Sequence, residues 1–314
     1  MELISVLMPT YNVEKFVGEA VESILSQTWT NFEFIIVDDC SQDNTYEILQ
    51  SYTAKDSRIK LYRNDVNSKI CKTLNRALKH AKGEYIVRMD GDDLSTPDRF
   101  EALYQYLQQH PDVDLVGSNT ITINEDGVEL GRKSYLLHNR AIQLGNRYMT
   151  AIAHIWMARR KVYNELHGYR DIPYAEDFDF LLRGKIKGFR YANVDKYLYS
   201  VRHRNGNTVS SNGLVQRKTV AYVKKIHRLE RLDKQNHFNV DEYKTCISCS
   251  QDEQEAYYHA ALLLSAAIKN KSNKMMMISR TIRAALSSSY IFSYLIDATM
   301  VRIIKKMENH GLLK

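Results

Sequence analysis

Short apolar runs alternate with longer amphipathic segments along the first ninety residues. The runs are rich in Val, Ile and Phe, as β-strands are, and the segments between them repeat apolar residues at helical spacing. The pattern predicts strands at residues 4–8, 34–37, 59–62 and 84–89, and helices at residues 13–27, 43–54 and 69–81. This β-α-β-α-β-α-β order indicates a parallel sheet with helices on its faces.

The pattern is less regular beyond the fourth strand. Thr96 is expected to cap a helix whose first residue is Pro97, because both residue types favour those positions. Further predictions are a β-like stretch at 113–123, a helix at 176–187, β-like pieces at 189–193 and 197–203, and helices from about residue 213. We therefore expect an α/β domain over residues 1–210 and a helical C-terminal region over residues 211–314.

Polar residues follow three of the predicted strands. Pro-Thr-Tyr-Asn comes after the first strand, DDCSQDN after the second and DGDD after the fourth. In open parallel sheets, ligands bind beyond the carboxyl ends of the strands. The three clusters are therefore expected to meet at one crevice.

The third cluster places Asp90, Asp92 and Asp93 within four positions, and carboxylates so close need water or a cation to offset their repulsion. A hydrated surface turn is one interpretation. A calcium-binding EF-hand loop is excluded, because Leu94 and Ser95 stand where a ligand and a glycine are required. An aspartyl nucleophile of the phosphatase type is disfavoured, because it usually follows the first strand of the sheet.

A divalent cation that joins these carboxylates to a diphosphate is the interpretation we favour. Mg²⁺ and Mn²⁺ prefer carboxylate, phosphate and water oxygens. The sequence contains neither GxxxxGK[ST] nor GxGxxG, so the phosphates need a partner other than a glycine-rich loop.

Charge is unevenly divided along the 314 residues, whose formal net charge is +7. Residues 1–200 hold 25 Lys+Arg and 28 Asp+Glu, a net charge of −3, whereas residues 201–314 hold 19 and 9, a net charge of +10. A basic C-terminal third favours an anionic partner.

Nucleic acid is not expected as this partner, because no nucleic-acid-binding motif occurs. An anionic membrane surface fits the uncharged run 284–296, which is flanked by cations and too short to span a bilayer. A packed helical cap with a solvated basic face is the alternative.

The four cysteines are too few for a disulfide scaffold. Cys246 and Cys249 form a CxxC pair that no second motif completes, so metal or redox use is not expected. No leader-like segment starts the sequence. The expected location is the cytoplasm, with peripheral attachment to the inner face of the cytoplasmic membrane if the basic region binds lipid.

Five segments together resemble glycosyltransferase family 2: SVLMPTYN, SILSQT, FIIVDDCSQDNT, LNRALKHAKGEYIVRMDGDD and AEDFDFLLR. The resemblance covers roughly residues 3–205. It implies a GT-A fold, that is, a Rossmann-like, mostly parallel sheet flanked by helices, here with a mainly helical C-terminal appendage. It also implies an inverting transfer from a nucleotide sugar, commonly a UDP-sugar, that depends on Mn²⁺ or Mg²⁺.

By this resemblance the strand-end clusters bind the donor. Asp39 would accept a hydrogen bond from the base, and Asp90 and Asp92 would form the DxD motif that contacts ribose and metal, with Asp92 as the metal ligand. Asp93 would complete that loop. The walls of the nucleotide pocket would be Pro9, Thr10, Tyr11 and Asn12. A bound cation would stabilise the charge that develops on the leaving diphosphate.

Asp177 matches the position that the family uses for the base that removes the proton of the acceptor hydroxyl. Alone, it would be explained as an acid at a helix N-terminus, where the helix dipole stabilises negative charge. Glu176 is expected to hold or tune Asp177.

Five weaker candidates complete the set. His154 lies where family members often carry a histidine near the donor–acceptor junction, although a structural role would also explain it. Arg183 could face the diphosphate or a neighbouring carboxylate, and His203 and Arg204 lie in a loop where some relatives contact the pyrophosphate. Lys69 stands where relatives usually have glycine, so a basic side chain could approach the donor there.

The resemblance implies a hexosyltransferase that moves a sugar to a hydroxyl of a saccharide or lipid-linked saccharide in O-antigen, capsule or lipopolysaccharide assembly. The QxxRW signature of processive synthases is absent, which favours transfer of a single residue. The rival hypothesis is a nucleotide-sugar-binding protein that has lost catalysis. The intact DxD and Glu-Asp elements argue against it.

Overall fold

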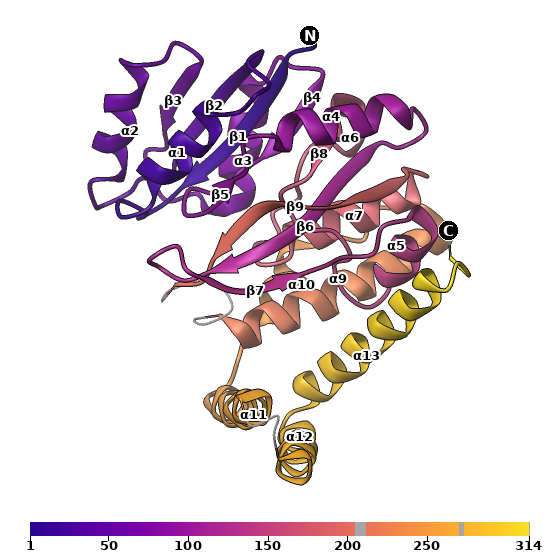
Figure 1. Ribbon diagram of the computed structural model, residues 1–314. Helices are drawn as coiled ribbons and strands as arrows, with labels where there is room; N and C mark the ends of the chain where they lie inside the picture. Colours follow the sequence, from indigo (N-terminus) through magenta and orange to yellow (C-terminus); the bar gives the residue numbers. More distant parts are fainter. Residues whose placement is uncertain (205–211, 270–272, 314) are drawn as a thin grey trace.

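A computed structural model describes residues 1–204, 212–269 and 273–313 (Figure 1). The strands are β1 (Ile4–Thr10), β2 (Phe32–Asp38), β3 (Ile59–Arg63), β4 (Tyr85–Arg88), β5 (Leu94–Ser95), β6 (Leu115–Ile123), β7 (Glu129–Lys133), β8 (Met157–Arg159) and β9 (Tyr191–Arg202). The helices before β9 are α1 (Val17–Leu25), α2 (Thr45–Thr53), α3 (Lys69–His80), α4 (Arg99–Gln109), α5 (Asn139–Gly145), α6 (Arg160–Leu166) and α7 (Glu176–Ile186). Those after it are α9 (Gly213–Asp233), α10 (Val240–Ile247), α11 (Gln251–Lys269), α12 (Lys274–Ser287) and α13 (Ser289–Asn309).

The strands form one sheet in the order β3-β2-β1-β4-β8-β6-β9-β5, and β7 pairs with β6 outside this path. β1 runs parallel to β2 and β4, β2 to β3, and β6 to β9. β8 lies antiparallel between β4 and β6, and β5 and β7 add short antiparallel pairings. The parallel arrangement expected for the first four strands is therefore confirmed, and the antiparallel pairings belong to the second half of the sheet.

Successive residues of the central strands enter two different cores. Ile4, Val6 and Met8 of β1 pack in the core that contains the apolar faces of α1 and α4. Leu7 points to the other face, into the core that α3, α6 and α7 share. Strands buried on both faces read as continuous apolar runs, which is why the sequence pattern identified them.

The segment after β4 differs from the sequence prediction. Leu94 and Ser95 form β5, which pairs with Ser200 and Tyr199 of β9. The helix expected to start at Pro97 begins two residues later as α4, with Asp98 in place of Thr96 as its N-cap residue. The two β-like pieces at 189–193 and 197–203 are one strand, β9, whose register against β6 shifts around Asn119. Tertiary pairing with β9 thus overrides the local capping signal.

The helices after β9 pack on the α/β part of the chain. Tyr222, Val223 and Ile226 of α9 share a core with Phe178 and Leu182 of α7. α11 and α12 lie together far from the sheet, and α13 runs back to α5 (Figure 1). The division expected between residues 210 and 211 lies outside the described residues.

The returning helix α13 is fixed by one carboxylate. Glu308 is 4% exposed, and its Oε1 accepts hydrogen bonds from the backbone N–H groups of Leu137 at 2.9 Å and His138 at 2.8 Å, just before α5.

Within the described ranges, no helix is both long and apolar enough to cross a membrane.

Candidate functional site

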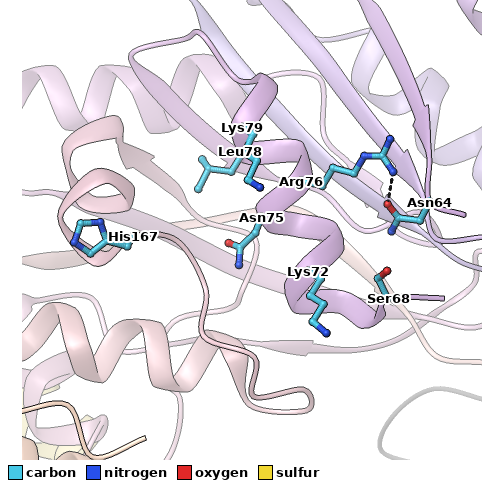
Figure 2. A pocket seen from close by; sticks show the side chains of 8 residues that line it. All are labelled: Asn64, Ser68, Lys72, Asn75, Arg76, Leu78, Lys79 and His167. Carbon is cyan, nitrogen blue, oxygen red and sulfur yellow. Dashed lines mark hydrogen bonds between the residues drawn. The ribbon is translucent and has the colours of Figure 1, made fainter. Parts of the chain in front are cut away.

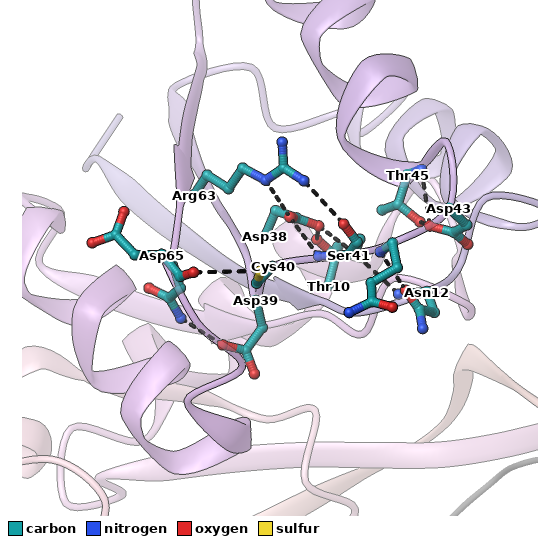
Figure 3. A network of polar contacts seen from close by, with 12 residues as sticks. Thr10, Asn12, Asp38, Asp39, Cys40, Ser41, Asp43, Thr45, Arg63 and Asp65 are labelled. Carbon is teal, nitrogen blue, oxygen red and sulfur yellow. Dashed lines mark hydrogen bonds and ion pairs between the residues drawn. The ribbon is translucent and has the colours of Figure 1, made fainter.

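The ends of β1 and β2 carry a dense polar network (Figure 3). Asp38 is fully buried and accepts hydrogen bonds from the backbone N–H of Ser41 at 3.0 Å and from the Thr10 hydroxyl at 3.4 Å. Arg63, at the end of β3, approaches Asp38 at 3.5 Å and donates to the Ser41 carbonyl at 2.9 Å. These contacts tie three strand ends into one rigid edge.

Of the four residues expected to wall the nucleotide pocket, two are buried and two are exposed. Pro9 and Thr10 are interior residues of β1, opposite Val37 and Asp38 of β2. Tyr11 is 43% exposed, and Asn12 next to it has a left-handed φ of 50°. The backbone therefore turns sharply at Asn12, and the Tyr11 ring is free to contact a ligand at this edge.

Asp39 lies beside this network and holds the start of α3. Its carboxylate accepts hydrogen bonds from the backbone N–H groups of Ser68 at 2.7 Å and Lys69 at 2.9 Å, and from the Asn64 amide at 2.6 Å. An acid at a helix N-terminus satisfies N–H groups that otherwise lack partners. The backbone of Lys69 adopts the left-handed region, with a φ of 67°, which is the conformation that glycine tolerates best. This conformation explains why a glycine would suit position 69.

A hollow of about 580 Å³ opens next to Asp39, along the exposed face of α3 (Figure 2). Its lining includes the basic residues Lys72, Arg76 and Lys79. Arg76 donates a hydrogen bond to the Asn64 side-chain oxygen at 2.6 Å, so the hollow and the Asp39 network share Asn64. Three cations on one helix face produce a positive potential next to the strand ends.

Arg88, at the end of β4, joins the two acidic motifs of the site. Its guanidinium donates to Asp90 Oδ1 at 3.0 Å and to Glu176 Oε1, at the start of α7, at 2.9 Å. The Arg88 side chain is only 5% exposed, and that of Glu176 is 10% exposed. One buried cation thus brings the DGDD loop and the Glu-Asp pair together, although Asp90 and Glu176 are 86 positions apart in sequence.

His154 completes this group. Its Nε2 lies 2.8 Å from Asp90 Oδ2. Although burial opposes ionisation, the charges of Arg88 and then His154 hold the pKa of Asp90 well below its usual range. Burial also opposes a charged imidazole, yet the Asp90 carboxylate outweighs it and raises the pKa of His154. Asp90 is therefore a carboxylate held between Arg88 and His154.

Asp92 and Asp93 have different partners. The Asp92 carboxylate accepts a hydrogen bond from Arg204 at 2.7 Å, and Asp93 accepts one from the backbone N–H of Arg202 at 2.7 Å. Burial, followed by the Asp92 and Asp90 charges, raises the pKa of Asp93 well above its usual range. Arg202, which is almost fully buried, also donates a hydrogen bond to the Asp92 carbonyl at 2.9 Å. The end of β9 therefore holds the acidic loop in place.

Three of these side chains fit a metal ion. Ligand atoms of Asp90, Asp93 and His154 all lie within 4.8 Å of one another. Two carboxylates and an imidazole nitrogen are a donor set that a divalent transition ion such as Mn²⁺ accepts, whereas Mg²⁺ prefers oxygen alone. Positive charge there would also favour ionisation of Asp93. Asp92, expected from the sequence as the metal ligand, does not belong to this group and pairs with Arg204 instead.

Asp177 stands in the first turn of α7, directly after Glu176. Burial first, and then the adjacent Glu176 carboxylate, raise the pKa of Asp177, while the charges of His154 and Arg88 act in the opposite direction. The helix N-terminus also favours the charged form. Asp177 is a partly buried carboxylate whose basicity is increased by its surroundings, as a proton acceptor requires.

The remaining candidate residues differ in whether they contact the acidic loop. Arg183 is turned away from the acidic loop: it pairs with Asp179 at 2.7 Å and donates to the carbonyls of Leu166 and Gly168, which anchors α7. Arg204 reaches the site through Asp92. His203 is exposed, and its backbone N–H bonds to the Ile123 carbonyl at 2.7 Å.

Sequence reasoning missed the buried arginines and a tyrosine behind the acidic loop. Arg88 and Arg202 hold the loop directly, and the Tyr199 hydroxyl accepts a hydrogen bond from the Asp90 backbone N–H at 3.1 Å. Arg99, fully buried at the start of α4, donates to the Arg88 carbonyl at 2.9 Å. For Arg88 the available signal was its position two residues before Asp90, where a carboxylate could pair with it.

Several known proteins are similar in sequence to this chain. The chain is 39% identical over 204 residues to the putative glycosyltransferase EpsE of Bacillus subtilis, covering 63% of this chain and 72% of EpsE. It is 32% identical to the O-antigen biosynthesis glycosyltransferase WbnJ of Escherichia coli, covering 67% of this chain and 84% of WbnJ.

Solved structures show the same fold at lower identity. S. aureus TarS in complex with UDP-GlcNAc superposes with a TM-score of 0.60 at 19% identity, covering 99% of this chain and 92% of the TarS chain. The Pyrobaculum calidifontis mannosyltransferase PcManGT, in complex with GDP-Man and Mn²⁺, has a TM-score of 0.57 at 18% identity, covering 97% and 87%. The expectation of a GT-A fold is confirmed. The sequence profile described as glycosyl transferase family 2 matches residues 5–167, more than half of the chain. The chain therefore belongs to glycosyltransferase family 2.

Proposed function

We propose that this protein is an inverting, metal-dependent glycosyltransferase that moves one hexose from a nucleotide sugar to a hydroxyl of a saccharide or lipid-linked saccharide. The observation that carries the proposal is the Arg88 bridge between Asp90 and Glu176. It puts a candidate donor-binding carboxylate and the candidate base Asp177 at one site. A binding protein without catalysis would have no need for this pairing.

The donor is proposed to be a UDP-sugar bound along the ends of β1, β2 and β4. Tyr11 would contact the base, and Asp39 would orient it through the loop that begins α3. The Asp39 carboxylate already accepts three hydrogen bonds from the chain, so it would act mainly by fixing this loop. TarS has been solved with UDP and with UDP-GlcNAc, whereas PcManGT holds GDP-Man, so the relatives support a nucleoside diphosphate sugar and leave UDP as our choice.

A divalent cation, Mn²⁺ in our proposal, would be held by Asp90, Asp93 and His154. When bound, such an ion stabilises the negative charge that develops on a departing diphosphate. Arg204, paired with Asp92, is close enough to the acidic loop to add a second positive charge on that side. His203 and Lys69 are both exposed, and their side chains are proposed to contact the donor.

Asp177 is proposed to take the proton of the acceptor hydroxyl as its oxygen attacks the sugar. Glu176 acts through Asp177: fixed by Arg88, it keeps a negative charge beside it and raises its proton affinity. Attack from the side opposite the leaving diphosphate gives inversion. The profile match ends at residue 167, so the role of Asp177 rests on the site geometry and the motif resemblance.

The biological setting is proposed to be assembly of a surface polysaccharide, O-antigen, capsule or lipopolysaccharide. The relatives include an O-antigen biosynthesis enzyme and a putative colanic acid biosynthesis glycosyl transferase, WcaA of Escherichia coli. We also propose a cytoplasmic location with peripheral contact to an anionic membrane. α12 supports this idea, because a stripe of exposed apolar residues runs along it: Met275, Ile278, Ile282 and Leu286.

The test is release of nucleoside diphosphate from a panel of UDP- and GDP-sugars, with Mn²⁺, Mg²⁺ or EDTA. We expect slow hydrolysis of one donor that requires the metal and is greater with Mn²⁺. Binding of a donor with no turnover under any condition, even with saccharide acceptors added, would support the rival protein that only binds nucleotide sugars.

A further inference from the structure

A second polar pocket lies between α7, the turn after α5, and α9. α9 belongs to the helical appendage and packs against α7 (Figure 1). Its volume is about 270 Å³. This is slightly smaller than the roughly 300–1,000 Å³ of pockets for drug-sized ligands. Lys185, eight residues beyond Asp177 on α7, is about 12 Å along the helix from that residue. The pocket is therefore separate from the donor site.

The walls of this α7–α9 pocket are strongly basic. Arg147, Lys185, Arg228 and Arg231 all line it. Lys224 lines the pocket as well, but its ammonium forms an ion pair with the Asp297 carboxylate of α13, with 2.5 Å between Nζ and Oδ2. For the other four cations, no carboxylate lies within ion-pair distance in the part of the chain that the structure describes. Lys185 is half-buried, and the guanidinium-bearing side chains of Arg147, Arg228 and Arg231 are exposed at the edge of the cavity.

This clustering affects the protonation of the pocket. Burial, with Arg147 and Arg231 adding to it, lowers the pKa of Lys185 to about 8. Burial, then Lys185 and Arg231, lower the pKa of His227 to about 4, although Asp179 acts in the opposite direction. Like charges held this close repel one another. A bound anion would relieve this repulsion.

Two buried side-chain nitrogen atoms that lack a hydrogen-bond partner among the described residues belong to the lining of the cavity. Asn146 is 0% exposed, and its Oδ1 accepts a hydrogen bond from the backbone N–H of Ala151 at 2.8 Å, which fixes the orientation of the amide. Its Nδ2 has no hydrogen-bond partner among the described residues. The same holds for the buried Nδ1 of His227. Buried polar groups are normally paired, so an unpaired amide donor in a basic cavity indicates a missing acceptor.

We infer that the α7–α9 pocket binds a phosphoryl anion, with Arg147, Lys185 and Arg231 as its charged ligands and the Asn146 amide as a neutral donor. A guanidinium group can donate two parallel hydrogen bonds to two oxygens of one phosphate. A phosphoryl group has more oxygens than a carboxylate, so it can bind several arginines at once. The anion is either free phosphate or pyrophosphate, or the phosphate of a lipid headgroup. Because α7 and α9 both contribute, the bound anion would join the appendage to the helix that begins with Glu176 and Asp177.

The test is isothermal titration of the full chain with inorganic phosphate and pyrophosphate in EDTA, which prevents metal-dependent binding at the donor site. Co-sedimentation with vesicles of phosphatidic acid in phosphatidylcholine forms the second arm. Arg231→Gln is the main variant. Lys225→Gln is the matched control, because Lys225 is on the same helix but pairs with Glu242 outside the pocket. Lys185→Gln is the second pocket variant.

We expect Arg231→Gln to weaken phosphoryl binding by at least about tenfold, since hydrogen bonds to charged groups are the strong ones. Lys225→Gln should bind as wild type does. Lys185→Gln should lose binding and yet unfold at a higher temperature without phosphate, because it removes an unbalanced charge. Binding to phosphatidic acid alone, with the same dependence on Arg231, would identify a lipid source. No binding in either arm, or equal binding by Arg231→Gln and wild type, would overturn the proposal.

Discussion

Among single residues, Arg88 has the largest structural role in the candidate site. It is buried between Asp90 and Glu176 at 3.0 and 2.9 Å, and its carbonyl accepts from Arg99. The acidic residues themselves could be predicted from the sequence, because they follow strands at a spacing that suits a metal and a diphosphate. The partner of Glu176 could not be, because the two residues meet only through the packing of α7 against the sheet.

Removing Arg88 should therefore destabilise the protein strongly. In Arg88→Met the Asp90 and Glu176 carboxylates stay buried without their cation, and we expect a loss of about 3–5 kcal/mol in the free energy of unfolding. Urea unfolding measures it. The control is Arg190→Met, whose partner Asp112 is about half exposed, as Arg190 is, so the loss should stay within about 1 kcal/mol. Equal losses in the two variants would contradict the central position of Arg88.

The Glu176 charge should set the pH dependence of turnover. The pKa of Asp177 is raised, so the basic form is present above that pKa and is lost as the pH falls through it. Glu176→Gln removes the negative neighbour, lowers the pKa of Asp177 and should move the acidic limb of the pH–rate profile to lower pH. The control is Asp171→Asn, because the Asp171 carboxylate pairs with Lys72 at 3.4 Å and is not among the charges that shift the pKa of Asp177; this variant should leave the limb in place. An acidic limb that does not move in Glu176→Gln would separate Asp177 from the measured proton transfer.

At the scale of elements, local signals located the helices and strands well but not all of their ends. The apolar runs gave β1, β2 and β4 because strands buried on both faces are mostly apolar. The start of α4 was misplaced because Leu94 and Ser95 pair with β9, a contact across about a hundred positions. The register shift in β9 likewise depends on its partner β6 and leaves no local signal.

The start of α3 offers a test of backbone strain. Lys69 has a φ of 67°, and a left-handed conformation costs a residue with a Cβ about 1–2 kcal/mol. Lys69→Gly should therefore stabilise the protein by about 0.5–1 kcal/mol in chemical unfolding, after the greater entropy of glycine in the unfolded chain is subtracted. Lys69→Ala should give no such gain. Lys72→Gly, within the same helix, should lose about 1 kcal/mol. A loss in Lys69→Gly equal to that of Lys72→Gly would be inconsistent with a strained residue.

Across the whole molecule, the basic C-terminal third is packed onto the enzyme and still exposes apolar surface. α9 shares a core with α7, and Glu308 of α13 caps the start of α5. Charge and periodicity predicted a basic helical region. They left a packed helical cap as one of two alternatives and did not identify its contacts, because α9 and α13 contact residues far away in sequence.

The apolar stripe of α12 should carry membrane binding. We expect wild type to sediment with vesicles that contain anionic lipid and much less with neutral vesicles. The double variant Ile282→Ser with Leu286→Ser should lose this binding, because both side chains are exposed. Leu232→Ser removes a similarly exposed leucine from the end of α9 and should bind as wild type does. Undiminished sedimentation of the double variant would eliminate α12 as the contact.

The central claim is that Asp90 and Asp177 serve the two ends of one transfer reaction. The most direct measurement compares Asp177→Asn with wild type in two assays: donor affinity by titration, and metal-dependent turnover of the same donor. We predict that turnover falls by at least about a hundredfold, as expected for loss of a general base. Donor affinity should stay within about threefold, a difference of less than 1 kcal/mol. Unchanged turnover, or turnover and affinity lost together, would contradict the assignment of Asp177 as the general base.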